Sequence, residues 1–192
     1  MSDHGFHVHG PHDHELEHAA QHGDKDSFSG QIAVMTAILA TIGALFSYMG
    51  GATQANAGLF KNNAAIKKTE ASNQWNYYQA KSSKQNLAEL ALALVPEDRK
   101  PTYTKEVERY KGEKAEIKLA ADKLEAESKD WDLKSDEQMH LHHRWAQATT
   151  ALQISIALAA IALLTKRKWL EYGMFGVAGL GVLLGLAAVL HW

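Results

Sequence analysis

Three long uncharged stretches most constrain what this chain can fold into. They cover residues 27–60, 145–165 and 172–192. A helix needs about 20 mostly apolar residues to cross a bilayer, and each stretch reaches that length. No proline lies in any of them, and strand-like alternation of apolar and polar residues is rare. The sequence therefore predicts an all-α membrane protein with transmembrane helices at 29–51, 145–165 and 172–192.

Composition narrows the class of function. The chain has 192 residues, a formal net charge of −2 and no cysteine. A charge balance this close to neutral gives no sign of a nucleic-acid partner. The lack of cysteine excludes disulfides, thiolate metal sites and cysteine nucleophiles. No pattern for nucleophilic catalysis occurs, and the uncharged stretches offer no charged pathway across a bilayer within one subunit. We therefore expect a protein that is not an enzyme.

Residues 1–28 form a tail rich in histidine and acid. Its histidines are His4, His7, His9, His12, His14, His18 and His22. Imidazole and carboxylate groups are ligands for Zn²⁺, Ni²⁺ and Cu²⁺, so the tail is a candidate metal-binding segment. The alternative is a solvated, weakly buffering tail that binds metal only incidentally, because so polar a segment provides no fixed scaffold for a tight site.

Residues 52–144 separate the first two uncharged stretches and show a seven-residue repeat. In the first half the predicted seam is Leu59, Ile66, Asn73, Ala80, Leu87 and Leu94, joined by Asn63, Glu70, Tyr77, Lys84 and Ala91. In the second half it is Tyr103, Tyr110, Ile117, Leu124, Trp131, Gln138 and Trp145, joined by Val107, Lys114, Ala121, Ser128, Ser135 and His142. Such spacing is typical of helices that pack lengthwise. Proline cannot continue a helix interior, so we predict an antiparallel coiled-coil-like helical hairpin, a stalk whose tip lies at 96–101.

A second candidate metal site precedes the second uncharged stretch. Glu137, His140 and His143 follow one another at three-residue steps. On a helix these side chains could share one broad face and hold a metal ion or a proton-linked switch. The alternative is that the histidines simply lie near lipid headgroups.

Aromatic residues and glycines suggest contacts between copies of the chain. Trp75, Tyr78 and Trp131 are large side chains on a two-helix stalk, where a single seam is not expected to cover all three. Gly181 and Gly185 form a GxxxG pair in the third uncharged stretch, and small residues at this spacing let transmembrane helices approach closely. We therefore predict a homo-oligomer with these five residues in its interface.

A short basic loop predicts the orientation in the membrane. Lys166, Arg167 and Lys168 lie in the loop 166–171, which joins the last two uncharged stretches. Short loops rich in lysine and arginine stay on the cytoplasmic side. The loop and the N-terminal tail are then cytoplasmic, and the stalk lies on the opposite, periplasmic side of a bacterial inner membrane.

Residues 68–87 resemble the signature of the DUF4337 family, which comprises bacterial membrane proteins of unknown function. The most specific parts are Gln74-Trp75 and Tyr77-Tyr78-Gln79-Ala80-Lys81. The histidine-rich start, one membrane helix before this segment and two at the end also fit. The resemblance implies bacterial origin and a helical architecture, and it implies no particular activity.

Two functions stay open. The first is a membrane-anchored structural or interaction protein that self-assembles or serves as an accessory subunit of a membrane complex. Its partners would be membrane lipid, further copies of the chain and other membrane proteins. The second is a metal-binding or metal-homeostasis accessory protein that uses the tail to hold Zn²⁺, Ni²⁺ or Cu²⁺.

Overall fold

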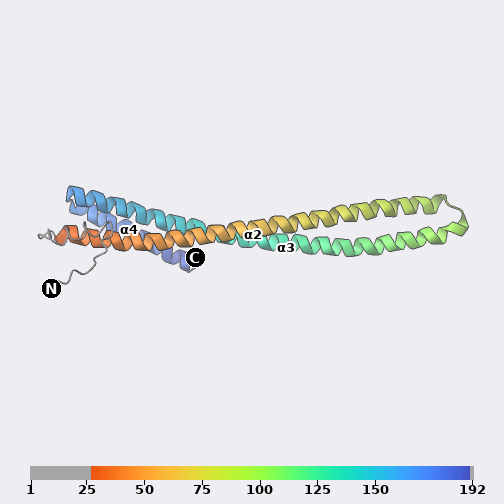
Figure 1. The fold of residues 1–192 in the computed structure, drawn as a ribbon, viewed down its shortest axis with the longest axis horizontal. Coiled ribbons are helices and arrows are strands. Elements are labelled where there is room, and N and C mark those ends of the chain that lie inside the picture. Colours follow the sequence, from red (N-terminus) through yellow and green to blue (C-terminus); the bar gives the residue numbers. More distant parts are fainter. Residues whose placement is uncertain (1–26, 191–192) are drawn as a thin grey trace, which may run out of the picture.

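The described part of the chain folds into three long helices joined by short turns. The structure is a computed structural model and describes residues 27–190. Helix α2 spans Ser27–Leu94, the 3-10 turn η1 spans Glu97–Arg99, α3 spans Lys100–Thr165 and α4 spans Lys168–Val189. Helices α2 and α3 lie antiparallel along their whole length, and α4 packs beside the end remote from the tip (Figure 1). The predicted all-α architecture with a hairpin between the first two spans is confirmed.

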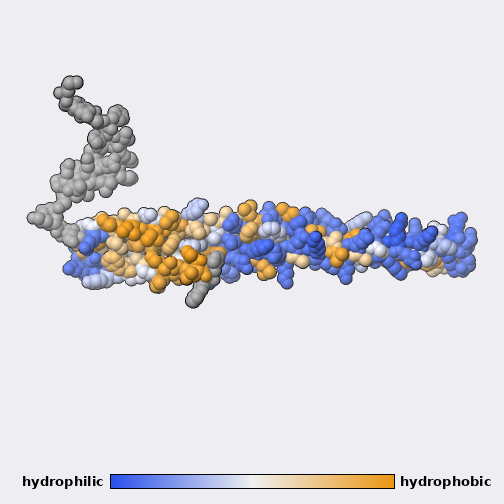
Figure 2. Space-filling view, turned by 90° about the horizontal axis from the view of Figure 1, so that it is seen from below, coloured by the Kyte–Doolittle hydropathy of each residue, from blue (hydrophilic) through white to orange (hydrophobic). Residues whose placement is uncertain are grey.

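All three helices are long and apolar enough to cross a membrane, judged by length and composition. Apolar side chains gather at the end of the molecule that contains α4, and polar side chains predominate over the rest, with smaller apolar patches between them (Figure 2). Helices α2 and α3 contain 68 and 66 residues, so each is about 100 Å long at ~1.5 Å per residue. Each therefore continues from the apolar end into the stalk without interruption.

Prolines and one left-handed residue shape the two turns. Pro96 follows the end of α2, and Arg99 N–H donates a hydrogen bond of 3.0 Å to its carbonyl. Pro101 occupies the first turn of α3, where the backbone N–H groups have no helical acceptor. Helix α3 ends at Thr165. Lys166 caps this end: its φ of 53° is left-handed, and its N–H donates a hydrogen bond to Ala162 O. The turn between α2 and α3 thus covers residues 95–99, which overlaps the tip predicted at 96–101, while Pro101 already belongs to α3.

The seam predicted for the first arm of the stalk is wrong. Leu59, Ile66, Leu87 and Leu94 are between 47 and 75% exposed, so this row points away from α3. The buried row of α2 in the stalk instead contains Thr53, Ala57, Ala64, Ala71, Gln85 and Ala88. Alanine brings the α2 backbone closer to α3 than leucine would, and close approach allows the hydrogen bonds described below. On α3 the predicted seam is confirmed, with Val107, Ile117, Ala121, Ser128, Ser135 and Trp145 all buried.

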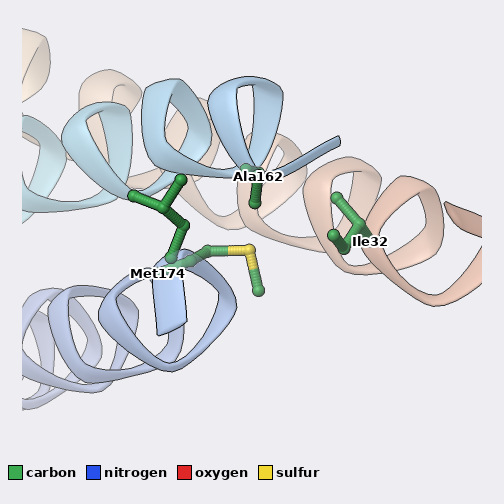
Figure 3. Packing of buried hydrophobic residues seen from close by; sticks show 5 residues of the cluster. Ile32, Ala162 and Met174 are labelled. Atoms are coloured by element: carbon green, nitrogen blue, oxygen red, sulfur yellow. The ribbon is translucent and has the colours of Figure 1, made fainter. Parts of the chain in front are cut away.

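Two hydrophobic clusters hold α4 against the hairpin. Ile32 of α2 and Ala162 of α3 pack with Met174 of α4, together with Ala159 and Leu170 (Figure 3). A second cluster contains Leu39, Leu152 and Ala178. Helix α4 packs mainly on α3 and meets α2 at few places. One side of the α2–α3 pair is therefore covered by α4.

Candidate functional site

Serine hydroxyls of α3 fix the register of the two arms. Ser128 Oγ donates a hydrogen bond of 2.8 Å to Ala64 O, and Ser135 Oγ donates one of 2.9 Å to Ala57 O. Both bonds are buried, and the two pairs stand seven residues apart on each helix. A hydroxyl reaches the backbone of the facing helix only where that helix carries a small side chain. The signal in the sequence was the alanine row opposite the serine row.

The same pattern continues to the junction of stalk and apolar end. His142 Nδ1 lies 2.9 Å from Gly50 O, and because a carbonyl only accepts, Nδ1 carries the proton. A Cβ on Gly50 would lie 3.3 Å from Trp145 Cβ, so a larger residue here would require the neighbouring helix to shift by a few tenths of an ångström. The Phe46 and Trp145 rings pack with centroids 5.2 Å apart. Trp145 is thus a buried part of the seam.

The aromatic residues predicted for contacts between copies make contacts within the hairpin of a single chain. Trp75 Nε1 donates a hydrogen bond of 3.2 Å to Glu125 Oε1 on α3, and its ring meets Tyr78 edge-on with centroids 5.6 Å apart. Lys114 Nζ lies 4.9 Å from the centroid of the Tyr78 ring. Trp131 packs on Phe60 with centroids 5.5 Å apart. Each of these rings is half-buried, so one seam covers more aromatic surface than expected.

The two glycines predicted for the oligomer interface face inward. A Cβ on Gly181 would lie 3.0 Å from Leu152 Cδ2, and one on Gly185 would lie 2.2 Å from Phe46 Cζ. Both glycines are buried. They let α4 approach α2 and α3 of its own chain, and their role between copies stays a prediction.

Ion pairs bridge the arms beside the seam. Lys61 pairs with Asp132 at 2.5 Å. Lys81 Nζ lies 2.6 Å from Glu113 Oε2, and both side chains are partly covered. This contact lowers the pKa of Glu113, and the same contact, with help from the Tyr77 hydroxyl, raises the pKa of Lys81. Lys61 and Lys81 of α2 therefore lie on its flanks, next to α3.

The proposed metal ligands are not brought together. Glu137, His140 and His143 are exposed on α3, and the His143 ring packs on His142 with centroids 5.6 Å apart. Within residues 27–190, no three His, Asp or Glu side chains are placed to hold a metal ion. The seven tail histidines lie outside the described residues, so metal binding by the tail stays a prediction.

The side of α2 turned away from α3 is exposed and carries no charge along the whole stalk. This uncharged outer face consists of Gly58, Leu59, Asn62, Ala65, Ile66, Thr69, Ser72, Asn73, Asn76, Gln79, Ala80, Ser83, Asn86, Leu87, Leu90, Ala93 and Leu94. Every one of these residues is exposed. By contrast, exposed residues of α3 include Lys105, Glu108, Lys111, Lys118, Asp122, Lys129 and Asp136. The two arms therefore offer very different surfaces to a partner.

Comparison with known proteins identifies a family. Neither a curated protein nor a solved structure matches the chain. The family model described as a domain of unknown function (DUF4337) matches residues 28–191. This range covers all three helices and the whole stalk. The chain belongs to the DUF4337 family.

Proposed function

We propose that this protein is a membrane-anchored structural stalk that assembles with further copies of itself, without catalysis of its own. The observation that carries the proposal is the uncharged outer face of α2. A water-exposed helix surface of this length ordinarily carries charged side chains, whereas the centres of protein interfaces are depleted of them. Leu59, Ile66, Leu87, Leu90 and Leu94 add exposed apolar area to the face.

Symmetry explains why this face suits a second copy. Copies anchored in one membrane share one direction, so a two-fold axis along the membrane normal places two α2 helices parallel and in register. In such an interface each residue near the axis meets its own copy. A charged residue would meet a like charge, which favours the uncharged outer face over the charged surface of α3. Asn73 lies midway along the face and would fix the register by pairing with its counterpart.

Disulfide cross-linking in membranes tests this assembly. The chain has no cysteine, so Ile66→Cys introduces a single thiol on the uncharged outer face. We expect oxidation to convert much of this variant into a covalent dimer. Leu119→Cys is the control on α3: Leu119 is 73% exposed against 47% for Ile66, yet this variant should cross-link weakly. Equal cross-linking of the two variants, or none at Ile66→Cys, contradicts the proposed interface. A cross-link to a different protein would instead indicate that the chain is an accessory subunit of a membrane complex.

We further propose that the stalk lies on the periplasmic side of a bacterial inner membrane and the loop after α3 on the cytoplasmic side. The basic residues Lys166, Arg167 and Lys168 support this orientation. In intact cells, Asp98→Cys at the stalk tip should react with a membrane-impermeant thiol reagent. Lys168→Cys should react only after lysis. The opposite pattern of labelling would reverse the orientation.

A further inference from the structure

An exposed glutamine lies deep in the predicted second span. Gln153 lies roughly 12 Å along α3 from Trp145, in a span of about 30 Å. Its side chain is exposed, and no residue of the described range 27–190 hydrogen-bonds to it. Lipid tails offer no hydrogen-bonding group, so an amide at this depth is costly without a polar partner.

Gln153 points away from α4. Ser155 of α3 is fully buried and donates a hydrogen bond of 2.8 Å to Met174 O of α4. Residues two positions apart on a helix point about 200° apart, so Gln153 lies on the side that α4 leaves uncovered. Steps of seven residues lead from Gln153 through Ala146 and Met139 to Asp132, which pairs with Lys61 of α2. Because Lys61 pairs with Asp132, the α2 residues at seven-residue steps before Lys61 lie on the same side of the hairpin as Gln153.

Small residues surround Gln153 on this side. Steps of seven back from Lys61 reach Gln54, Ser47, Ala40 and Ala33, all exposed. We call Ala33, Ala40, Ser47, Ala146 and Gln153 the Gln153 side. Small residues combined with a polar side chain are the usual composition of transmembrane helix contacts, because they allow close approach and a hydrogen bond.

A cavity lined by both apolar and polar side chains lies on the same side. It has a volume of about 340 Å³, and its lining includes Ser47, Gln54, Ala146 and Thr149. Thr149 Oγ1 is buried and has no hydrogen-bond partner among the described residues. Buried polar atoms in native proteins are ordinarily bonded. The single chain therefore leaves polar groups unsatisfied at two neighbouring turns of α3.

We propose that the Gln153 side is a transmembrane interface that takes a second copy of this chain, with the two Gln153 amides hydrogen-bonded to each other. Copies related by an axis along the membrane normal hold Gln153 at equal depth. An amide contains both donors and an acceptor, so it is complementary to itself. The inference rests on the proposed self-assembly but uses a face distinct from the uncharged outer face of α2. A chain that uses both faces has two neighbours, so the assembly extends beyond a dimer.

Cross-linking of single-cysteine variants in membranes tests the Gln153 side. Ala146→Cys should form a covalent dimer on oxidation, and adding Gln153→Leu should weaken this association about 3- to 30-fold, the range for one interhelical hydrogen bond in lipid. Gln153→Asn should retain most of it. Ile154→Leu, an exposed neighbour on α3, is the matched control and should change nothing. Because Gln153→Leu makes a lipid-facing position more apolar, the variant should fold, which its helical circular dichroism checks.

The outcomes separate this inference from the proposed function. Cross-linking at Ile66→Cys without any at Ala146→Cys overturns the Gln153 interface and leaves self-assembly through the stalk standing. If neither Ile66→Cys nor Ala146→Cys cross-links, both the Gln153 interface and self-assembly through the stalk are overturned. If Ala146→Cys cross-links equally well with and without Gln153→Leu, the Gln153 amides do not stabilise the interface. Persistence of the Ile66→Cys dimer in the Gln153→Leu variant, with loss at Ala146→Cys, confirms two separate interfaces.

Discussion

Replacing Ala121 by proline is expected to break the second arm of the stalk and cost ~3 kcal/mol or more of stability. Ala121 lies in the interior of α3 and is 0% exposed. Proline has no N–H to donate to the carbonyl of Ile117, and its ring clashes with that carbonyl. The break would fall in the middle of the seam, so the packing of both arms toward the tip should loosen.

Thermal unfolding of the detergent-solubilised protein, followed by far-UV circular dichroism, measures this effect. Thr102→Pro is the matched control, because it puts the same residue into the first turn of α3, where the N–H groups have no helical acceptor. This control should melt close to the unmodified protein. If Ala121→Pro keeps the helical signal and melting temperature of Thr102→Pro, α3 is not the continuous helix described here.

Replacing Ala71 by leucine is expected to push the arms apart and destabilise the stalk by about 1–3 kcal/mol, the usual cost of overpacking a close-packed contact. Ala71 is 0% exposed and lies in the row that contains Ala57 and Ala64. A larger side chain there should also lengthen or break the hydrogen bond from Ser128 to Ala64 O one heptad away.

Ala80→Leu is the control that separates the two candidate seams of α2. Ala80 is exposed and belongs to the row of Leu59 and Ile66, which the seven-residue pattern of apolar residues had favoured as the seam. We expect Ala80→Leu to leave the melting temperature of the hairpin unchanged or to raise it by favouring contact between copies. A larger loss of stability from Ala80→Leu than from Ala71→Leu would restore the predicted seam and refute the observed one.

The two arms show why a heptad pattern predicts one helix and not the other. On α3 the predicted apolar seam is the buried face, although Leu119 and Leu133 lie outside it and are exposed. On α2 two rows compete, one with Leu59 and Ile66 and one with Ala57 and Ala64. The apolar pattern of α2 favours the first row, but this pattern contains no information about the surface of α3 that faces it. Ser128 and Ser135 gain hydrogen bonds only against the alanines.

The glycine pair illustrates the same limit for the candidate site. A GxxxG pair indicates that another helix approaches closely, and this is correct for Gly181 and Gly185. The pattern does not reveal whether that helix belongs to the same chain. In the structure the approaching atoms come from Leu152 and Phe46. The aromatic residues of the stalk also find their partners within the same chain. Trp75 donates a hydrogen bond to Glu125, and Trp131 packs on Phe60.

The sequence by itself determined the helical class, the three spans, the stalk tip and the seam of α3. These follow from local properties: the length of an uncharged stretch, the missing N–H of proline and the apolar residues at seven-residue spacing on α3. Only the tertiary structure decided which row of α2 is buried, which side α4 covers, and that Gln153 and the uncharged outer face remain exposed. Those features depend on how closely two helix surfaces fit and on which polar atoms find hydrogen-bond partners. Both are properties of packed helices and cannot be inferred from one helix alone.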